Sequence, residues 1–516
     1  MSELKEILRK EIREFREQGH KFVNKELNVA QFKAISGGMG AYAHRGGETF
    51  MIRIKTPSGM ASKEDLNKIY EWATRYKLES VHPTTREAVQ LHGLTIDEVC
   101  DVMEEALDYG IITRGGGGNF PRNVAMSPLA GVLKDEPFDV TPYAKAINDH
   151  IASKVYTYKL PRKLKIAMSS NENDEAHCTA VDMGFVAIKN NGEDAFSLYI
   201  GGGLGRNPRT AVKFDELVKP EEIIYHVEAM TNLFMAEGDY KNKGKARIRY
   251  IADRMGDEAF KECYKKHLEE VLKGKDLTIK VEPVTISKKG IKTDIKHKRL
   301  IEQKTEGLYS VYFHPIGGIL KTEDLKMIID LTKDMEDVDY RFAMTEGMYI
   351  RNLNGEEAIK VLELTNNKGG EIDVMQSISC IGVPVCQMGL CNSQGLLNNI
   401  VNLLKEKDVT KDLLPRIHIS GCANSCGVHE IGEIGFTGKS KRVNDEVKKC
   451  FELHVGGSFK LGETKLAKAY GDIVEDEIPN YIYDLYKALE EKNIRFETWY
   501  KENELEFEEI TKKYLV

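Results

Sequence analysis

The 516-residue sequence contains no apolar run that approaches the ~18–20 residues a helix needs to span a bilayer. Its first residues, Met1-Ser2-Glu3-Leu4-Lys5-Glu6, are charged from the start and lack the apolar core of a secretory signal. Positive charge is not in excess either, because 81 acidic residues against 74 basic ones give a formal net charge of −7. These absences argue against membrane insertion, export and broad nucleic-acid binding. We therefore expect a cytoplasmic protein with neither a membrane nor a nucleic-acid partner.

A nucleotide-cofactor signature is missing as well. The run Gly201-Gly202-Gly203-Leu204-Gly205 does not fit the Gly-x-Gly-x-x-Gly fingerprint of a dinucleotide-binding β-α-β unit. We find no flavin or nicotinamide motif elsewhere in the sequence. Any redox chemistry of this chain therefore needs electrons from a separate carrier.

The composition that is present is that of an ordinary globular protein, with 41% hydrophobic and 30% charged residues. The length suggests two to four domains. Apolar residues at helical spacing predict a helix over residues 2–18, and the glycine-rich residues 20–49 predict an extended, loop-rich entry segment. The highly charged residues 484–516 predict a solvated helical cap at the C-terminus.

A β-α-β pattern occurs twice in the chain. Residues 51–94 contain an apolar strand, a Pro-x-Gly turn, a helix and a second strand, and residues 310–353 repeat this order. Asp65-Leu66 matches Asp324-Leu325, and Glu87 matches Glu346, at one offset of 259 positions. We expect two related half-domains that pair in space, the alternative being a chance match of two common units.

Five of the nine cysteines lie between Cys380 and Cys426. An odd, bunched set without an export signal favours metal or cluster ligation over disulfides. Five residues separate Cys380 from Cys386, which suits zinc poorly, and three separate Cys422 from Cys426. Four thiolates in two pairs suit a [4Fe–4S] cluster, in which each iron takes one terminal ligand. The other cysteines are assigned to packing: Cys100, Cys178, Cys263, Cys391 and Cys450.

The run Gly421-Cys422-Ala423-Asn424-Ser425-Cys426-Gly427, together with Cys380-x5-Cys386, resembles the siroheme- and [4Fe–4S]-containing sulfite/nitrite reductase family of the ferredoxin-dependent type. The resemblance runs in order from about residue 50 to about residue 460. It implies an α+β fold of three domains, with pseudo-twofold repeated modules around one siroheme–iron–sulfur centre. It also implies that Cys380, Cys386, Cys422 and Cys426 hold the cluster, and that Cys426 is axial to the siroheme iron.

With this resemblance the chain divides into five expected segments. They are an N-terminal helix and extended entry segment (1–49), a first ferredoxin-like half-domain (50–114), a first siroheme-binding α/β domain (115–305), a second ferredoxin-like half-domain (306–370), and an iron–sulfur/siroheme domain with a C-terminal helical cap (371–516).

A small oxyanion held on a heme that itself carries carboxylates needs fixed positive charge and a supply of protons. Four cations match the family positions that ring the distal face of the heme and are expected to be catalytic: Arg53, Arg122, Lys163 and Lys165. The two lysines would point to the same side of a strand. Further matches are expected to contact the siroheme: Arg86, Gln90, Arg162, Gly201, Gly202, Gly203, Arg247 and Asn424. Glu87 stands where the family usually has glutamine, and Arg247 is the weaker match because basic helices are usually solvated.

The resemblance implies a six-electron reduction of a small oxyanion, either sulfite to sulfide or nitrite to ammonia. Nitrite reductases of the family tend to carry asparagine at the position of Lys165. Sulfite must lose three oxygens as water, so a second proton donor favours sulfite, with nitrite as the alternative. We expect ferredoxin, or else a flavoprotein subunit, as electron donor, and by analogy a monomer.

Two other classes stay open from the sequence. An iron–sulfur electron-transfer subunit without active siroheme would keep the cysteines but would not need the cations. A structural zinc protein would have to use an unsuited ligand spacing and would leave the cations unexplained. The presence of Arg53, Arg122, Lys163 and Lys165 together with Cys426 favours the reductase.

Overall fold

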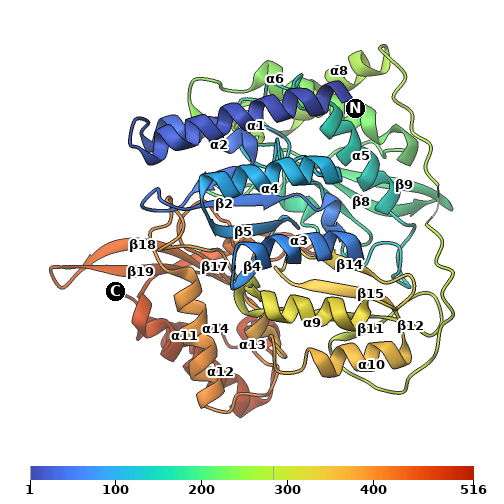
Figure 1. Cartoon of the computed structure of the whole chain (residues 1–516). Coiled ribbons are helices and arrows are strands. Elements are labelled where there is room, and N and C mark those ends of the chain that lie inside the picture. Colours follow the sequence, from blue (N-terminus) through green and yellow to red (C-terminus); the bar gives the residue numbers. More distant parts are fainter. Residues whose placement is uncertain (1, 283) are drawn as a thin grey trace.

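The computed structural model describes residues 2–282 and 284–516 and has a mixed α+β architecture built on four five-stranded sheets (Figure 1). Two sheets belong to the predicted half-domains, and two belong to the segments that follow them. No helix in these two ranges is both long and apolar enough to cross a membrane.

The N-terminal segment consists of two helices, α1 (Ser2–Val23) and α2 (Val29–Met39), which lie along one side of the molecule (Figure 1). The prediction of an extended entry segment is therefore wrong for residues 29–39. The helix α2 begins at a reciprocal cap, in which Asn28 Oδ1 accepts from Gln31 N at 3.0 Å and Gln31 Oε1 accepts from Asn28 N at 2.9 Å. The ring of Phe32 stacks on Phe22 at 4.4 Å. This cap and the contacts of Phe32 with the rings of Phe15, Phe22 and Phe50 stabilise a helix whose glycines hide the apolar period.

The two half-domains repeat one another, as the sequence predicts. The first contains β1 (Ala41–Ala43), β2 (Phe50–Ile54), α3 (Lys63–Arg75), β4 (Ser80–Pro83), β5 (Val89–Leu94) and α4 (Ile96–Tyr109). The second contains β11 (Leu300–Glu302), β12 (Leu308–Phe313), α9 (Thr322–Thr332), β14 (Asp339–Phe342), β15 (Met348–Asn354) and α10 (Gly355–Leu364). The matched Leu66 and Leu325 are both fully buried in one shared hydrophobic core.

Each half-domain lends a short strand to the other. The strand β3 (Met60–Ala61) pairs with β14, and β13 (Leu320–Lys321) pairs with β4, both antiparallel. The sheet orders are accordingly β1-β2-β5-β4-β13 and β11-β12-β15-β14-β3. This reciprocal exchange places the half-domains side by side although they lie far apart in the sequence (Figure 1).

The segments that follow the half-domains also repeat, as the family resemblance implies, although no residue pattern in the sequence marks this repeat. Their sheets are β6 (Ala125–Met126), β7 (Ile166–Ser169), β8 (Met183–Asn190), β9 (Glu193–Ile200) and β10 (Val212–Lys213), and β16 (Ile378–Ser379), β17 (Ile417–Ser420), β18 (Ile434–Val443), β19 (Glu446–Val455) and β20 (Lys468–Val474). In each sheet the first three strands run parallel, and each of the last two strands pairs antiparallel with the strand before it.

Helices complete both segments: α5 (Thr141–Ser153), α6 (Ile223–Glu237), α7 (Ile248–Met255) and α8 (Asp257–Leu272) in the first, and α11 (Ser393–Glu406), α12 (Ile478–Lys492), α13 (Phe496–Glu502) and α14 (Glu504–Lys512) in the second. The C-terminal helices are not merely a solvated cap, because Trp499 and Phe507 are fully buried in the core of this segment. Their charged faces dominate the local composition and conceal the two apolar anchors.

In each half-domain one glutamate of a matched pair joins the half-domain to the sheet that follows it. Both adopt left-handed backbone conformations, with φ of 55° at Glu87 and 67° at Glu346. The Glu87 carboxyl accepts from Met126 N at 3.0 Å, and Glu346 Oε2 accepts from Ser379 N at 2.9 Å. Burial raises the pKa of Glu87 to about 8, so this group is uncharged in the fold under mildly acidic conditions.

We expect Glu87→Gln to remove a pH dependence of folding stability. The pKa of Glu87 is higher in the folded chain than in the unfolded chain. Its contribution to the free energy of unfolding is therefore full below about pH 4.5 and is lost as the pH rises to about 8. The slope should be roughly 1.4 kcal/mol per pH unit in that window. Denaturant unfolding across pH measures this slope in the variant, with Glu79→Gln on the exposed surface as control. An unchanged slope in Glu87→Gln would contradict the prediction.

Candidate functional site

The cysteines follow two neighbouring parallel strands, β16 and β17, in which Ile378 pairs with His418 and Ser379 pairs with Ile419. Cys380 comes directly after the first strand, and Cys422 comes two residues after the second. The carboxyl ends of parallel strands meet at one edge of a sheet, where ligands commonly bind. The backbone N–H of Gly421 donates to Cys380 Sγ at 3.2 Å, so the two loops are in direct contact.

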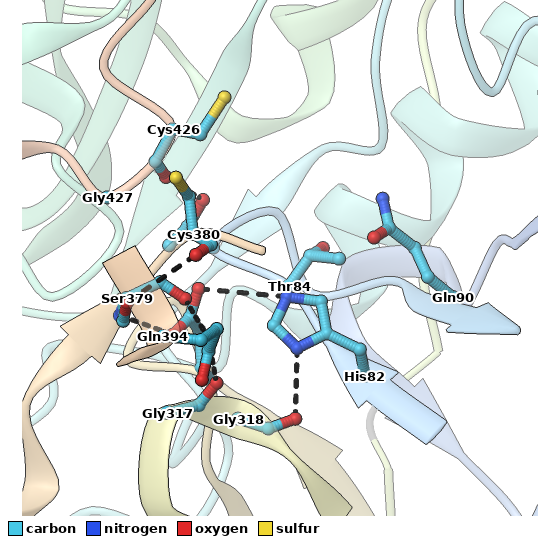
Figure 2. Close-up of polar contacts among 12 residues, drawn as sticks. His82, Thr84, Gln90, Gly317, Gly318, Ser379, Cys380, Gln394, Cys426 and Gly427 are labelled. Carbon is cyan, nitrogen blue, oxygen red and sulfur yellow. Dashed lines mark hydrogen bonds and ion pairs between the residues drawn. The ribbon is translucent and has the colours of Figure 1, made fainter. Parts of the chain in front are cut away.

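The four predicted ligand thiols share one neighbourhood. Burial raises the pKa of Cys380 to about 12, and the nearby Cys426 thiol adds to this. Burial also raises the pKa of Cys422, with contributions from Cys426 and Cys386. Figure 2 shows Cys380 and Cys426 next to one another, while Ser379 and Gly317 are tied together through Gln394.

No group of three or more His, Cys, Asp or Glu side chains in the described part of the chain closes onto a single metal ion. Four thiols that share a neighbourhood without converging on one point suit a cluster in which each iron takes its own thiolate. Cys391, by contrast, is buried and directs its Sγ to the carbonyl of Lys439 at 3.3 Å.

The predicted cationic residues come from three separate elements. Arg53 lies on β2 and donates to the carbonyl of Gly116 at 2.6 Å. Arg122 precedes β6 and donates to the carbonyls of Gly117, Gly118 and Phe120 at 2.9, 2.7 and 2.8 Å. Backbone oxygens of Gly116, Gly117 and Gly118 thus accept hydrogen bonds from both guanidinium groups, which fixes their positions without neutralising their charge.

Lys163 and Lys165 lie on either side of the fully buried Leu164, just before β7. Both side chains therefore face the same way, as the alternation of an extended chain requires. Burial lowers the pKa of Lys165 to about 7, with Arg247 and Arg86 contributing, and the pKa of Lys163 lies well below its ordinary value for the same reason and because of Lys165.

The charges of this site act on one another. Burial lowers the pKa of Arg122 to about 9, and Arg53, Arg247 and Arg162 lower it further. The Cys426 thiol opposes the shift at both Lys163 and Lys165. The structure therefore brings all four predicted catalytic cations and Cys426 into one strongly positive site, which favours a polyanionic occupant.

Arg86 points to such an occupant most directly. Its Nη2 donates to the carbonyls of Ile166, at 2.8 Å, and Asn123, whereas its Nε and Nη1 are buried without a hydrogen-bond partner. The adjacent Thr85 donates from Oγ1 to the carbonyl of Cys426 at 2.8 Å. Unsatisfied buried guanidinium atoms are costly, and a ligand carboxylate would satisfy them.

The glycine-rich run at residues 201–205 packs against the loop that contains Cys422 and Cys426. A Cβ atom at Gly205 would lie 3.8 Å from the carbonyl of Asn424, and one at Gly203 would lie 3.2 Å from both Arg247 Nη2 and Arg249 Nη1. Gly203 has φ of 156° and Gly201 has φ of 81°. A Cβ at Gly202 would lie only 2.7 Å from the carbonyl of Val181. Gly201, Gly202 and Gly203 therefore form a wall without side chains next to the arginines, and Gly205 approaches Asn424.

Arg247 differs from the solvated basic residue that its sequence context indicates. It is only 7% exposed, stands at the start of α7 and binds Asp182 through Nη2 at 2.8 and 2.9 Å. Asp182 also accepts from the backbone N–H of Lys165 at 2.7 Å. This carboxylate links Arg247 to the lysine pair, and sequence reasoning missed it because no motif marks it.

Two predicted siroheme contacts lie at the margin of this arrangement. Gln90, on β5, is buried, and its Oε1 lies 3.0 Å from His92 Nε2. In Figure 2 it stands apart from the pair formed by Cys380 and Cys426. Arg162 is half-buried, and its charge reaches Arg122.

Sequence reasoning also missed Lys55 and Tyr42. Lys55 lies two residues after Arg53, on the same side of the chain, and donates from Nζ to the carbonyl of Arg114 at 2.7 Å. Burial lowers its pKa to about 7, with Arg122 adding to the shift. The hydroxyl of Tyr42 accepts from Gly118 N at 3.2 Å. The two-residue period from Arg53 could have identified Lys55.

These residues fit the implied cofactors: four thiols in one neighbourhood, a cluster of buried cations, an arginine with unsatisfied atoms and a glycine wall. Two family models match the chain. "Nitrite and sulphite reductase 4Fe-4S domain" matches residues 117–272, and "Nitrite/Sulfite reductase ferredoxin-like half domain" matches residues 42–109.

Curated relatives are similar over most of the chain. The chain is 26% identical to sulfite reductase [ferredoxin] 1 of Mycolicibacterium paratuberculosis, over 80% of this chain and 74% of that protein. It is 23% identical to the assimilatory ferredoxin-dependent nitrite reductase of Haloferax mediterranei, over 94% of this chain and 87% of the relative. The solved structure of the Mycobacterium tuberculosis NirA protein shares the fold, with a TM-score of 0.77, 22% identity, and coverage of 94% of this chain and 93% of that one.

Proposed function

The chain belongs to the nitrite and sulfite reductase family, whose members are oxidoreductases that use siroheme and a [4Fe–4S] cluster, and we propose that it reduces sulfite to sulfide. The observation that carries the proposal is the joint site of Arg53, Arg122, Lys163, Lys165 and Cys426. A silent electron-transfer subunit would have no use for buried cations, which are expensive to maintain without a bound anion.

The residues proposed to hold the cofactors come from the family resemblance, and the geometry of the site supports them. Cys380, Cys386, Cys422 and Cys426 would bind the cluster, and Cys426 would also bind the siroheme iron. The unsatisfied atoms of Arg86, the Arg247 guanidinium and the glycine wall at residues 201–203 would face the siroheme carboxylates. When bound, the coupled centre supplies the electrons of the six-electron reduction.

The chain itself supplies the anion site and the protons. Arg53 and Arg122 are held by backbone oxygens and would orient the oxyanion. Lys163 and Lys165 have lowered pKa values in the chain alone, and a bound anion would raise them because opposite charge favours the protonated form. Each lysine would then keep its proton until an oxygen of the anion accepts it.

The relatives include enzymes named for sulfite and enzymes named for nitrite, so the preference rests on Lys165. Sulfite loses three oxygens as water and nitrite loses two, so the removal of oxygen takes more protons for sulfite, whereas nitrite spends its further protons on nitrogen. The second lysine supplies a proton donor that asparagine cannot replace. Reduction of nitrite to ammonia at the same site is the second candidate.

Lys165→Asn is expected to lower kcat/KM for sulfite by about tenfold or more, and for nitrite by clearly less. Steady-state kinetics with each anion, using the same reduced donor, measure the difference. Lys159→Asn, at an exposed position nearby in the sequence, is the matched control and should change neither value. Equal losses for both anions would remove the argument for sulfite.

Ferredoxin is the proposed electron donor, since relatives that use it are similar over most of the chain. Turnover with reduced ferredoxin tests this, and turnover only with a flavoprotein would refute it. The reductase itself is tested by an absorption spectrum with iron and labile sulfide counted on the same sample. We expect a Soret band, about five irons and about four sulfides per chain. A protein with the cluster but unable to take up added siroheme would be an electron-transfer subunit.

A further inference from the structure

The repeated C-terminal segment contains a second copy of the wall and cation that form the siroheme site. Arg416 directly precedes β17, as Lys165 directly precedes β7. Gly456 and Gly457 directly follow β19, as Gly201 and Gly202 follow β9. Arg495 stands directly before α13, as Arg247 stands directly before α7. We call this arrangement the second cradle.

The second cradle encloses a cavity of about 710 Å³, within the size range of small-molecule sites. Its lining combines residues of the cradle with His177 and Thr345 from the other repeats. Thr345 is the counterpart of Arg86, so the second copy has a neutral residue where the siroheme site has a cation. The cavity therefore offers a different chemistry from the site of Lys163 and Lys165.

The inner end of this cavity contains unsatisfied polar atoms. Arg416 Nε and His177 Nδ1 are buried without a hydrogen-bond partner. Arg416 lies over the Tyr312 ring at 5.5 Å and donates from Nη2 to Gln376 Oε1 at 2.7 Å. The side chain is 31% exposed, and its Nε is the one donor that is buried without an acceptor, which an anion that enters the cavity could supply.

The charge balance around Arg416 leaves one positive charge in excess. Three cations, Arg416, Lys298 and Arg495, stand against two ionised carboxylates. Asp373 and Asp412 are both shared by Lys298 and Arg495, and Asp373 lies 3.9 Å from Arg416 Nε. Glu175 lies within electrostatic reach of Arg416, but burial raises its pKa and favours its uncharged form. At the rim, Lys501 pairs with Glu497 at 2.9 Å. The cavity is thus suited to a single negative charge at its inner end.

The lining combines charged side chains, among them Glu433, Lys460 and Glu463, with apolar and aromatic ones. The rings of Phe459 and His177 are 4.4 Å apart, and Phe496 stacks on Tyr500 at 5.7 Å with an interplanar angle of 7°. Ile431 is 1% exposed and completes the lining. The apolar and aromatic side chains favour a flat apolar body by burial of its surface, in addition to ring contacts.

We propose that the cavity of the second cradle binds an organic monoanion with an aromatic body, whose carboxylate is held by Arg416. The unsatisfied guanidinium atom, the single excess charge and the aromatic walls all select this class. An inorganic oxyanion would leave most of the cavity empty, and a neutral aromatic would leave Arg416 unsatisfied.

The test uses the holoenzyme and 4-fluorobenzoate, with binding followed by ¹⁹F NMR. We expect saturable binding of one molecule per chain that saturating sulfite does not displace. Arg416→Gln should weaken it by about tenfold or more, the effect of losing a charged hydrogen bond. Arg442→Gln, at an exposed arginine of β18, is the matched control and should bind like the parent.

A second variant covers the case in which Arg416→Gln does not fold. Ser458→Phe places a ring in the cavity lining without touching Arg416, and it should abolish binding while Ser440→Phe does not. Absence of saturable binding, displacement by sulfite, or equal binding to both Ser458→Phe and the parent would overturn the proposal. Sulfate or 4-fluorobenzyl alcohol binding as tightly as 4-fluorobenzoate would overturn the assignment to an aromatic monoanion.

Discussion

Cys426→Ala is expected to yield a folded protein without a Soret band and with sulfite and nitrite reduction at background. Cys426 is the most exposed of the four predicted ligand cysteines and faces the site that contains Lys163 and Lys165. Its carbonyl is fixed by Thr85, so the loop position does not depend on the thiol. Removing the sulfur would take away a proposed cluster ligand and the proposed axial ligand together.

The measurement is the absorption spectrum and iron content of the variant beside the parent. Cys391→Ala is the control, because that thiol packs in the core and contacts the carbonyls of Lys439 and Cys450. It should keep its spectrum and activity at a modest cost in stability. A Cys426→Ala protein with a normal Soret band and turnover would show that another residue binds the siroheme iron.

Lys163→Met is expected to lower turnover by about 10²–10⁴-fold while the siroheme and cluster spectra stay unchanged. The side chain shares one face with Lys165 and lies among the charges of Arg122 and Arg247. Methionine retains much of the apolar stem but holds no proton, so the variant isolates the cation and its proton from packing.

Stopped-flow reoxidation of the reduced enzyme by sulfite measures the loss, and Lys159→Met serves as the exposed control. The same variant distinguishes two roles for Lys163. Loss of the spectrum would indicate a structural part in holding siroheme, whereas unchanged turnover with a normal spectrum would exclude Lys163 from proton delivery.

That the cysteines of each pair lie close together could be predicted because each pair is local in sequence, whereas the approach of the two pairs could not be read from spacing. Cys422 and Cys426 lie in one loop, and a spacing in sequence is nearly a spacing in space when few residues intervene. The half-domain repeat could also be predicted, because Asp65 and Glu87 recur as Asp324 and Glu346 at the same offset in sequence. Their structural equivalence is confirmed by the matching backbone conformations of Glu87 and Glu346.

The features that the sequence did not predict depend on long-range burial. Asp182 carries no motif, and only the fold shows that it neutralises Arg247. The second cradle was missed because its residues changed type while the backbone kept its register. Lys165 corresponds to Arg416, and Arg86 corresponds to Thr345. Helix α2 was missed because its stability comes from a cap at Asn28 and from the packing of one residue, Phe32, against three rings, neither of which produces an apolar period.

The reciprocal exchange of β3 and β13 has a consequence during synthesis on the ribosome. The chain emerges N-terminus first, so β4 is made long before its partner Leu320–Lys321 exists. Until then the first half-domain presents an open strand edge at β4 and carries β3 without a sheet to join. Nascent chains of this protein therefore expose strand edges that could pair with those of other nascent chains. A chaperone that covers the edge of β4 would protect them until β14, which ends at residue 342, has been made.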